Sequence, residues 1–266
     1  MLRTECRPYA SPVTAIDALI RPDRYPLSSR YDPRWVVALE MGPHPLWQLE
    51  DIVPALALEP GDRVLDLGCG RGATSVFLAR ECGVTVTACD LWVNAEELAG
   101  VFRKAGVEGS VTPVNADARQ LPFADDEFDA IVSIDAFEYF GTDVHLLPAL
   151  LRVLKSGGTI GMTTPGLEPD PYEADVPDAV WSLWQHEVAA WHTPEWWRRH
   201  WELSGLLEGI ESAWLPDGRE NWIRWVEAVQ SMSGEGEAAV LDLLEGGTGE
   251  QLGFVSVTAR AIAVRA

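Results

Sequence analysis

The chain has 266 residues, enough for one large domain or two small ones. Hydrophobic residues make up 47% and charged residues 23%, a composition typical of a soluble globular protein rather than a disordered one. The formal net charge of −21 repels phosphate groups, which excludes nucleic acid and anionic membrane lipid as large partners. A small-molecule partner is the expectation, and the sequence says nothing about the oligomeric state.

The sequence predicts a cytoplasmic protein with reduced thiols. Segment 1–13 lacks the apolar run of a signal peptide, and no stretch reaches the roughly 18 apolar residues that a membrane-spanning helix needs. The four cysteines form no CxxC pair and have no metal-ligand spacing with histidine. Acidic residues are spread along the chain, so we expect no metal site.

The first 43 residues are rich in Pro, Arg and Tyr and predict an irregular N-terminal arm with a short helix at Val13–Ile20. We expect a single domain over residues 44–266. It begins with a helix at Pro45–Leu58, where apolar residues recur at helical spacing, and Pro54 is expected to kink or divide this helix. A turn at Glu59–Asp62 follows.

From residue 63 onward, short apolar strands alternate with helices. Strands that alternate with helices at this spacing are typical of right-handed βαβ units in a parallel sheet. The expected strands are 63–67, 84–89, 111–115, 128–134 and 159–164, and the expected helices are 73–81, 94–105 and 146–154. Lys155–Gly158 is expected to stop the last of these helices, with Gly as its C-cap.

Residues 165–201 interrupt this alternation and read as an inserted lid, loop-like and acidic at first and then rich in tryptophan. Thr193-Pro194-Glu195 is typical of a helix start, and this helix should run to about Ser204. A strand at 206–215, a helical region at 219–245 with a glycine break at 234–236, and a strand at 254–264 complete the chain. The expected fold is therefore α/β: a Rossmann-like, doubly wound, mostly parallel seven-stranded sheet.

The strongest local signal is the run Asp66-Leu-Gly-Cys-Gly-Arg-Gly72, between the first strand and its helix. Glycines at this point allow a ligand to approach the backbone, and the helix N-terminus supplies N–H donors. A dinucleotide fingerprint, with Ala73 as its third small residue, is one interpretation. Asp66 argues against it, because a carboxylate there would repel a pyrophosphate and would tolerate an α-amino group or a sulfonium.

The pattern D-x-G-x-G-x-G after an apolar strand resembles motif I of the class I S-adenosylmethionine (SAM)-dependent methyltransferases. Residues 46–165 resemble this family through four motifs in order, which include Asp90 at the end of the second strand, Asp117 after the third, and the segments 123–140 and 150–158. The resemblance implies SAM as cofactor, with S-adenosylhomocysteine as product. The cofactor-binding residues that it implies are Asp66, Gly68, Cys69, Gly70, Asp90, Leu91, Trp92, Asp117, Ala118 and Ser133.

In that family the acidic residue after strand two holds the ribose hydroxyls, and the Asp after strand three binds the adenine amino group. Each position also has a structural alternative. Asp66 could be an ion-paired structural residue, Asp90 could cap the next helix, and Asp117 could be a turn residue. Trp92 could flank adenine or pack under the sheet.

The end of the fourth strand is expected to orient the methyl acceptor, because ligands bind at the carboxyl ends of strands in such sheets. Glu138 and Tyr139 are the first candidates there, and Asp135 is the next. His186 and His192 are further candidate acids or bases, although a lone histidine is more often structural. The string SIDAFEYFG also resembles cyclopropane fatty-acid synthases, whose Glu helps to hold a bicarbonate, but Asp135, Ala136 and Tyr139 depart from that branch.

Twelve tryptophans is an unusual number, and nine of them lie between Trp181 and Trp225. They could fix the lid to the sheet, or they could form an aromatic cage for a flat ring or an amine. Trp197 and Trp201 share a helix face at i,i+4 spacing. Met41–His44 is a candidate cover for the other side of the site.

The resemblance implies a SAM-dependent methyltransferase (EC 2.1.1) that acts on a small molecule at an amine, hydroxyl or carbon. An aromatic or amine-containing acceptor is favoured. The alternatives are a cyclopropane fatty-acid synthase-like lipid modification, a SAM-binding enzyme that performs other chemistry, and a catalytically silent SAM-binding module. A nicotinamide oxidoreductase is disfavoured by Asp66.

Overall fold

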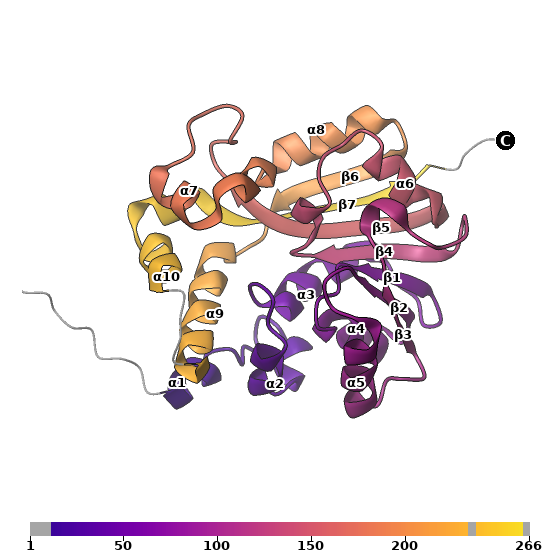
Figure 1. Ribbon diagram of the computed structural model, residues 1–266, viewed down its shortest axis with the longest axis horizontal. Coiled ribbons are helices and arrows are strands. Elements are labelled where there is room, and N and C mark those ends of the chain that lie inside the picture. Colours follow the sequence, from indigo (N-terminus) through magenta and orange to yellow (C-terminus); the bar gives the residue numbers. More distant parts are fainter. Residues whose placement is uncertain (1–11, 234–237, 263–266) are drawn as a thin grey trace, which may run out of the picture.

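The computed structural model describes residues 12–233 and 238–262, and its centre is a seven-stranded sheet in the order β3-β2-β1-β4-β5-β7-β6 (Figure 1). The pairs among β1 to β5 are parallel, whereas β7 runs antiparallel to both β5 and β6. The mostly parallel α/β fold predicted from the sequence is therefore confirmed. The strands are β1 (Arg63–Leu67), β2 (Thr85–Asp90), β3 (Val111–Asn115), β4 (Phe128–Ile134), β5 (Leu154–Leu167), β6 (Leu207–Trp214) and β7 (Leu252–Ala261).

Helices cover both faces of this sheet (Figure 1). On one face, α3 (Pro45–Leu56), α4 (Ala73–Phe77) and α5 (Ala95–Ala105) bury Leu49, Phe77 and Phe102 in one core cluster. On the other face, α6 (Leu146–Arg152) and α8 (Pro194–Ser204) bury Leu150, Trp197 and Trp201 in a second cluster. These two layers make the sheet interior dry on both sides, which explains why its central strands are continuous apolar runs.

The parallel sheet changes winding direction between β1 and β4, which are neighbours in space but not in sequence. Strands β2 and β3 extend the sheet to one side of this point, and β5 extends it to the other. In open α/β sheets the crevice at the carboxyl ends of such neighbours is the usual ligand site. The glycine loop that follows β1 and the turn that follows β4 both lie at this position.

Strand β5 is longer than predicted at both ends. Helix α6 ends at Arg152, and Leu154 already pairs with Phe128 in the ladder. The expected glycine C-cap of α6 is therefore wrong. The register shifts between Phe128 and Ala130, and a Cβ at Gly158 would lie 2.7 Å from the carbonyl oxygen of Asp129. Gly158 therefore accommodates an irregularity in the pairing of β4 with β5 rather than the end of a helix.

The other differences lie at element boundaries. Helix α3 is continuous across Pro54, so the expected division did not occur. The helix predicted at 73–81 changes to a π-helix at Leu78–Cys82, and the first helix is α1 (Pro12–Asp17). The predicted glycine break at 234–236 and the last residues of the predicted final strand lie outside the described residues. On either side of that break lie α9 (Gly218–Ser233) and α10 (Ala238–Glu245).

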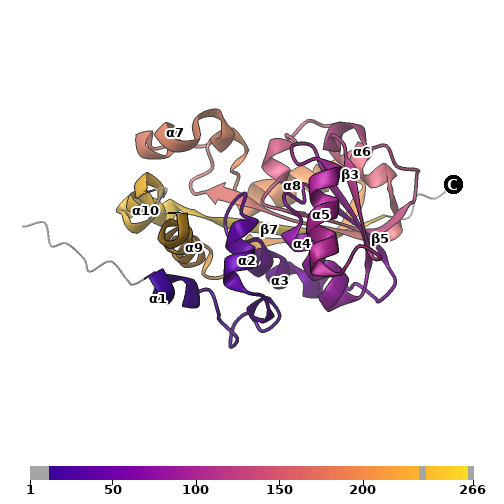
Figure 2. The same cartoon turned by 60° about the horizontal axis from the view of Figure 1, so that its bottom comes forward.

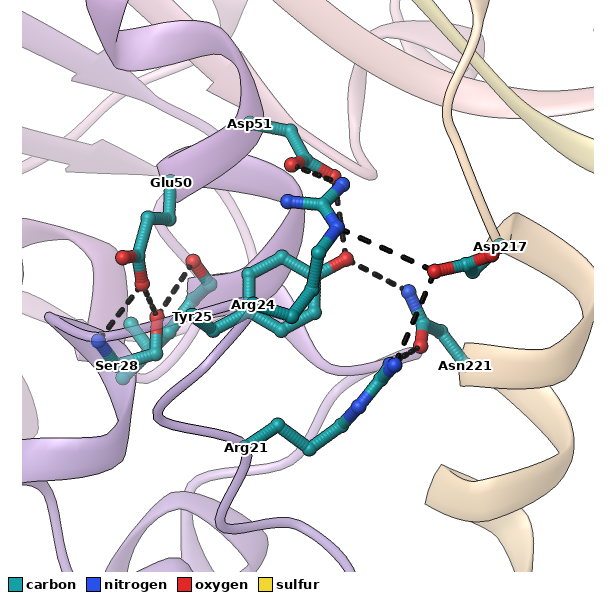
Figure 3. Close-up of polar contacts among 9 residues, drawn as sticks. Arg21, Arg24, Tyr25, Ser28, Glu50, Asp51, Asp217 and Asn221 are labelled. Atoms are coloured by element: carbon teal, nitrogen blue, oxygen red, sulfur yellow. Dashed lines mark hydrogen bonds and ion pairs between the residues drawn. The ribbon is translucent and has the colours of Figure 1, made fainter.

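The N-terminal arm is fastened to the domain by a polar network (Figure 3). Arg24 forms an ion pair with Asp51 of α3 at 2.6 Å, and the hydroxyl of Tyr25 donates to the same carboxylate at 3.2 Å. Asn221 of α9 donates to the Tyr25 hydroxyl at 2.8 Å and accepts from Arg21 at 2.6 Å. The arm thus connects α3 and α9, two helices distant in sequence.

A third apolar cluster lies beyond the carboxyl ends of the strands, where α7 (Asp178–Trp184) is close to α9 and α10 (Figures 1 and 2). Its largest members are Trp191, Trp222 and Phe254. Residues 165–167 of the predicted insertion belong to β5, and α8 packs on the sheet. The part of the insertion outside the sheet layers is therefore 168–193.

We predict that Trp201→Ala lowers the free energy of unfolding by about 3–5 kcal/mol, because it removes a fully buried indole from the core under α8. Trp181→Ala is the matched control, since the Trp181 side chain is 51% exposed and should contribute little. Urea unfolding monitored by circular dichroism measures both. Equal losses in the two variants would contradict this account of the core.

Candidate active site

Three adjoining cavities follow the carboxyl edge of the sheet, and Tyr139 lines all of them. The loop cavity, about 70 Å³, lies beside the glycine loop after β1. The outer cavity, about 170 Å³, lies between the ends of β2 and β3. The tryptophan cavity, about 260 Å³, lies beyond β4, between the arm, α9 and the segment 184–191.

The glycine loop that lines the first two cavities has a backbone that other residues would not adopt. Gly68, Gly70 and Gly72 have φ values of +74°, +52° and +86°. A Cβ at Gly68 would lie 2.5 Å from the Cβ of Ala136, and one at Gly70 would lie 3.2 Å from the sulfur of Met41. The three glycines thus provide both the left-handed turn and the space beside β4 and the arm.

Asp66 lies beneath this loop rather than in a cavity. Its Oδ2 accepts hydrogen bonds from Thr74 Oγ1 at 2.7 Å and Ser75 Oγ at 2.5 Å, and Oδ1 has no partner among the described residues. Burial raises its pKa to about 6, although the two hydroxyls oppose this shift. The geometry therefore supports a structural role for Asp66, which holds the start of α4 beneath the loop.

Asp90 connects the ends of β1 and β2. Its Oδ2 accepts from the Gly70 N–H at 2.9 Å, and its Oδ1 accepts from the N–H groups of Trp92 and Val93 at 2.8 and 2.9 Å. The side chain also lines both the loop cavity and the outer cavity. Asp90 thus holds the glycine loop and the turn after β2, and it lines both cavities. The alternative that it caps the next helix is wrong, because Asn94 caps α5.

Leu91, Trp92, Asp117 and Ala118 all line the outer cavity, as the sequence motifs imply for a purine site. Asp117 forms an ion pair with Arg119 at 2.7 Å, and hydrogen bonds from Arg119 lower the pKa of this carboxyl. Cys69 lines the loop cavity. Ser133, another predicted contact, is buried with no partner for its hydroxyl among the described residues, and it lines none of the three cavities.

The tryptophan cavity combines aromatic rings with carboxyl groups. Within the described part of the chain, no Lys, Arg or His lines it. Its rings come from the turn after β4, from the segment after β5 and from α9, and its carboxyl groups come from the arm, the end of β4 and the 3₁₀ helix Gln185–Ala190. The rings are those of Tyr139, Trp184, Trp191, Trp222 and Trp225, and the acids are Glu40, Asp135, Glu138 and Glu187.

Two of these acids form a pair at the end of β4. Burial raises the pKa of Asp135 to about 7. Burial, and then the nearby Asp135, raise the pKa of Glu138 well above its usual range. Thr164 Oγ1 donates to Glu138 Oε2 at 3.1 Å. Two carboxyl groups so placed do not both ionise readily, so the pair retains a proton near neutral pH.

Tyr139 is the third candidate of this segment. Burial and the carboxyl groups of Glu138 and Asp135 raise the pKa of its phenol, which therefore stays neutral. Its hydroxyl donates to Glu187 at 3.4 Å, and its ring meets Trp92 edge-on at 5.0 Å. The side chain thus separates the outer cavity from the tryptophan cavity.

The two candidate histidines lie elsewhere. His186 is exposed and lines none of the three cavities. His192 is buried, with its ring 3.0 Å from Asp170 and stacked on Trp196 at 3.4 Å. Trp197 and Trp201 pack in the core between α8 and the sheet, and they line none of the three cavities. The aromatic lining of the tryptophan cavity therefore comes from other tryptophans.

Sequence reasoning missed the contribution of α9. Trp222, Trp225 and Val229 recur at i, i+3 and i+7, so they share the helix face that lines the tryptophan cavity. This spacing is visible in the sequence, but nothing there places α9 beside the arm. The expected cover at 41–44 is partly in place, because Met41, Gly42 and Pro43 line both the loop cavity and the tryptophan cavity.

Two negative findings apply to residues 12–233 and 238–262. Within them, no helix is both long and apolar enough to cross a bilayer. Nor do these residues contain a group of three or more His, Cys, Asp or Glu side chains placed to hold a metal ion.

Comparison with known proteins identifies a family for the middle part of the chain, which includes the glycine loop and β1 to β4. Residues 64–158 match the methyltransferase domain family. The chain is 35% identical over 114 residues to Methyltransferase GfsG of Streptomyces halstedii, and 40% identical over 134 residues to the demethylmenaquinone methyltransferase of Clavibacter sepedonicus. These matches cover 42% and 50% of this chain, and 41% and 53% of those proteins, so the chain spans about half the length of the curated relatives it matches.

Among solved structures, the fold resembles phosphoethanolamine N-methyltransferase 2 of Haemonchus contortus in complex with SAM, with a TM-score of 0.70 and 19% identity. The likeness covers 93% of this chain and 60% of that one. At such identity it concerns the fold alone. Together with the family match over 64–158, it shows that this chain contains a domain of the class I SAM-dependent methyltransferase superfamily.

Proposed function

We propose that this protein transfers the methyl group of SAM to a small molecule that carries an amine. The observation that supports this most directly is the position of the tryptophan cavity. It borders the loop cavity along Met41, Gly42, Pro43, Asp135 and Tyr139. A donor held at the glycine loop and an acceptor held among the tryptophans would meet at this border.

The residues of the loop and outer cavities fit SAM in chemistry. The cofactor carries an adenine, a ribose and a methionine end, and it supplies a methyl group on a positively charged sulfur. Asp117, Leu91 and Ala118 would hold the adenine, and Asp90 would hold the ribose. Gly68 and Gly70 leave room for the methionine end in the loop cavity. Arg71 lines the same cavity and is its cationic side chain among the described residues.

The charge and aromaticity of the tryptophan cavity favour an amine over an anion. Its four acids would attract an ammonium group, and the faces of its rings would add cation–π attraction. An acceptor with a phosphate or carboxylate would find no cationic side chain among the described lining residues. The same acids disfavour a bicarbonate, which weakens the cyclopropane fatty-acid synthase alternative.

The protein's main task in the proposed reaction is positioning. Methyl transfer from a sulfonium needs the nucleophile and the methyl carbon close and in line, and the rings around the cavity would restrict how an acceptor can lie. The rings and the arm also limit the access of water. Orientation and exclusion of water together make the acid pair at the end of β4 more effective than it would be in solution.

We predict that Asp90→Asn weakens SAM binding by about 1.5–3 kcal/mol, the range for a hydrogen bond to a charged group. This substitution keeps the shape of the side chain and one of its two accepting oxygens, so a urea unfolding curve is recorded beside the titration to check that the loop still folds. Calorimetric titration with SAM measures the effect. Glu96→Gln is the control, because Glu96 is exposed on α5 and lines none of the three cavities. Equal affinity in wild type and Asp90→Asn would contradict the proposed ribose contact.

We predict that the site selects among matched aromatic probes by charge. In the presence of S-adenosylhomocysteine, 2-phenylethylamine should bind at least about tenfold more tightly than 2-phenylethanol, and phenylacetate should bind least. Quenching of tryptophan fluorescence at neutral pH follows binding. Trp222→Leu should reduce the preference, whereas Trp181→Leu should leave it intact. Tighter binding of phenylacetate would overturn the amine assignment, and a product heavier by one CH₂ would support transfer.

We also predict that residues 168–193 close over the acceptor. Hydrogen exchange in this segment should slow when S-adenosylhomocysteine and an amine are both bound, because the segment borders the tryptophan cavity. Amides of the central strand β4 serve as the internal reference. Unchanged exchange at saturation with both ligands would count against a lid.

A further inference from the structure

We propose that Asp135, rather than Glu138, accepts the proton of the acceptor amine. This inference rests on the proposed function. Asp135 is the carboxyl group on the border, because it lines both the loop cavity and the tryptophan cavity. Glu138 lines only the second of these. Methyl transfer occurs where donor and acceptor meet, so the group that takes the proton must lie at that border.

The backbone fixes Asp135 at this place. Its φ is +52°, a conformation that aspartate tolerates and most residues avoid. Its N–H donates to the carbonyl oxygen of Thr163 on β5 at 2.9 Å. From the other side, a Cβ at Gly42 would lie 2.1 Å from Asp135 Oδ2, so the arm approaches the carboxylate as closely as a glycine permits.

Glu138 lies deeper than Asp135. Its side chain is only 8% exposed, and its Oε2 is engaged by the hydroxyl of Thr164. The hydrogen bond from Thr164 favours the ionised carboxylate, but burial and the nearby Asp135 outweigh it and raise the pKa of Glu138, so Glu138 is better suited to keep the proton that the pair retains near neutral pH. Asp135 is then the member of the pair that can be ionised at the border, with its pKa of about 7.

The groups that face this pair in the tryptophan cavity come from two further elements and from the pair's own turn, and they are acidic or neutral. Glu40 belongs to the arm, Glu187 to the 3₁₀ helix after α7, and Tyr139 to the turn that carries the pair itself. Among the described residues no cationic side chain lines the tryptophan cavity, whereas Arg71 and Asp90 line the loop cavity on the other side of Asp135. On the tryptophan side, an ammonium acceptor would therefore be the positive partner of Asp135.

The step balances without any further reactant. The ammonium nitrogen gives one proton to a carboxylate oxygen of Asp135 and regains its lone pair. That lone pair forms the new N–C bond, while the C–S bond breaks and its electron pair goes to sulfur. The nitrogen leaves with a positive charge, the sulfur becomes neutral, and the proton on Asp135 returns to solvent after the product departs.

The first test measures turnover against pH in Asp135→Asn. A base must be ionised to act, so wild-type kcat/KM, which reports the free enzyme, should rise with pH and level off above about 7. Asp135→Asn should lose this plateau, because only the small fraction of neutral amine can then react, and should reduce kcat at neutral pH by about 10²-fold or more, with a smaller effect on SAM affinity. Asp126→Asn is the matched control, because Asp126 has a similar φ of +54° but lies exposed and away from the cavities.

Glu138→Gln separates the two members of the pair. If Glu138 holds the retained proton, the neutral amide imitates it, and the loss of kcat should be at least tenfold smaller than in Asp135→Asn. The rise near pH 7 should persist. A larger loss in Glu138→Gln than in Asp135→Asn would reverse the assignment.

A binding measurement tests Asp135 without turnover. At pH 7, wild type should release part of a proton when 2-phenylethylamine binds with S-adenosylhomocysteine, because Asp135 is partly protonated beforehand. In the complex, the amine and Asp135 together keep one proton. The number of protons released is the same whether the amine nitrogen or the Asp135 carboxylate holds it. Calorimetry in two buffers of different ionisation heat measures it. Asp135→Asn should abolish the release, and a wild type that binds the amine without release would overturn the inference.

The two proposals can fail separately. If wild type binds SAM and the amine with proton release but forms no methylated product, the proposed methyl transfer is refuted. The proton release would still support Asp135 as the acidic group at the border. If wild type methylates amines while Asp135→Asn keeps its rate and pH profile, the transfer stands and the role of Asp135 is refuted.

Discussion

The close approach of Gly42 to Asp135 is the constraint on which the candidate site depends. Any side chain at Gly42 would collide with the Asp135 carboxylate, because a Cβ would lie only 2.1 Å from Oδ2. This contact divides the carboxyl edge of the sheet into a side that faces the glycine loop and a side that faces the tryptophans. Gly42 and Asp135 line both the loop cavity and the tryptophan cavity, so the contact lies on the border where donor and acceptor would meet.

The arm can hold this position because it is fastened at two places before Gly42. Upstream, Arg24 and Tyr25 connect it to α3 and α9. Close to the contact, Arg71 of the glycine loop donates to the carbonyl oxygen of Glu40 at 3.1 Å. The loop that would hold the cofactor and the wall of the acceptor cavity are thus mechanically connected, so a shift in one moves the other.

The sequence predicted the sheet and its motifs well because those signals are local: alternating strands and helices, and glycines at a strand end. It could not show that Asp66 turns beneath the loop, because its hydroxyl partners, Thr74 and Ser75, need the folded start of α4. Nor could it separate the core tryptophans of α8 from the cavity tryptophans of α9. Both helices are amphipathic and aromatic, and only long-range packing decides which face meets the sheet.

The electrostatics of the tryptophan cavity suit a reaction in which positive charge moves. In methyl transfer to an amine, the charge passes from sulfur on the loop side to nitrogen on the tryptophan side, across the border at Asp135. Glu40, Glu138 and Glu187 lie on the receiving side, and the rings among them keep water away. Once the ammonium has given its proton to Asp135 and its nitrogen is neutral, fixed dipoles and charges on that side would stabilise the positive charge that returns to the nitrogen in the transition state. This distribution of acids supports the proposed attack by nitrogen, because an acceptor that stayed neutral after reaction would gain nothing from it.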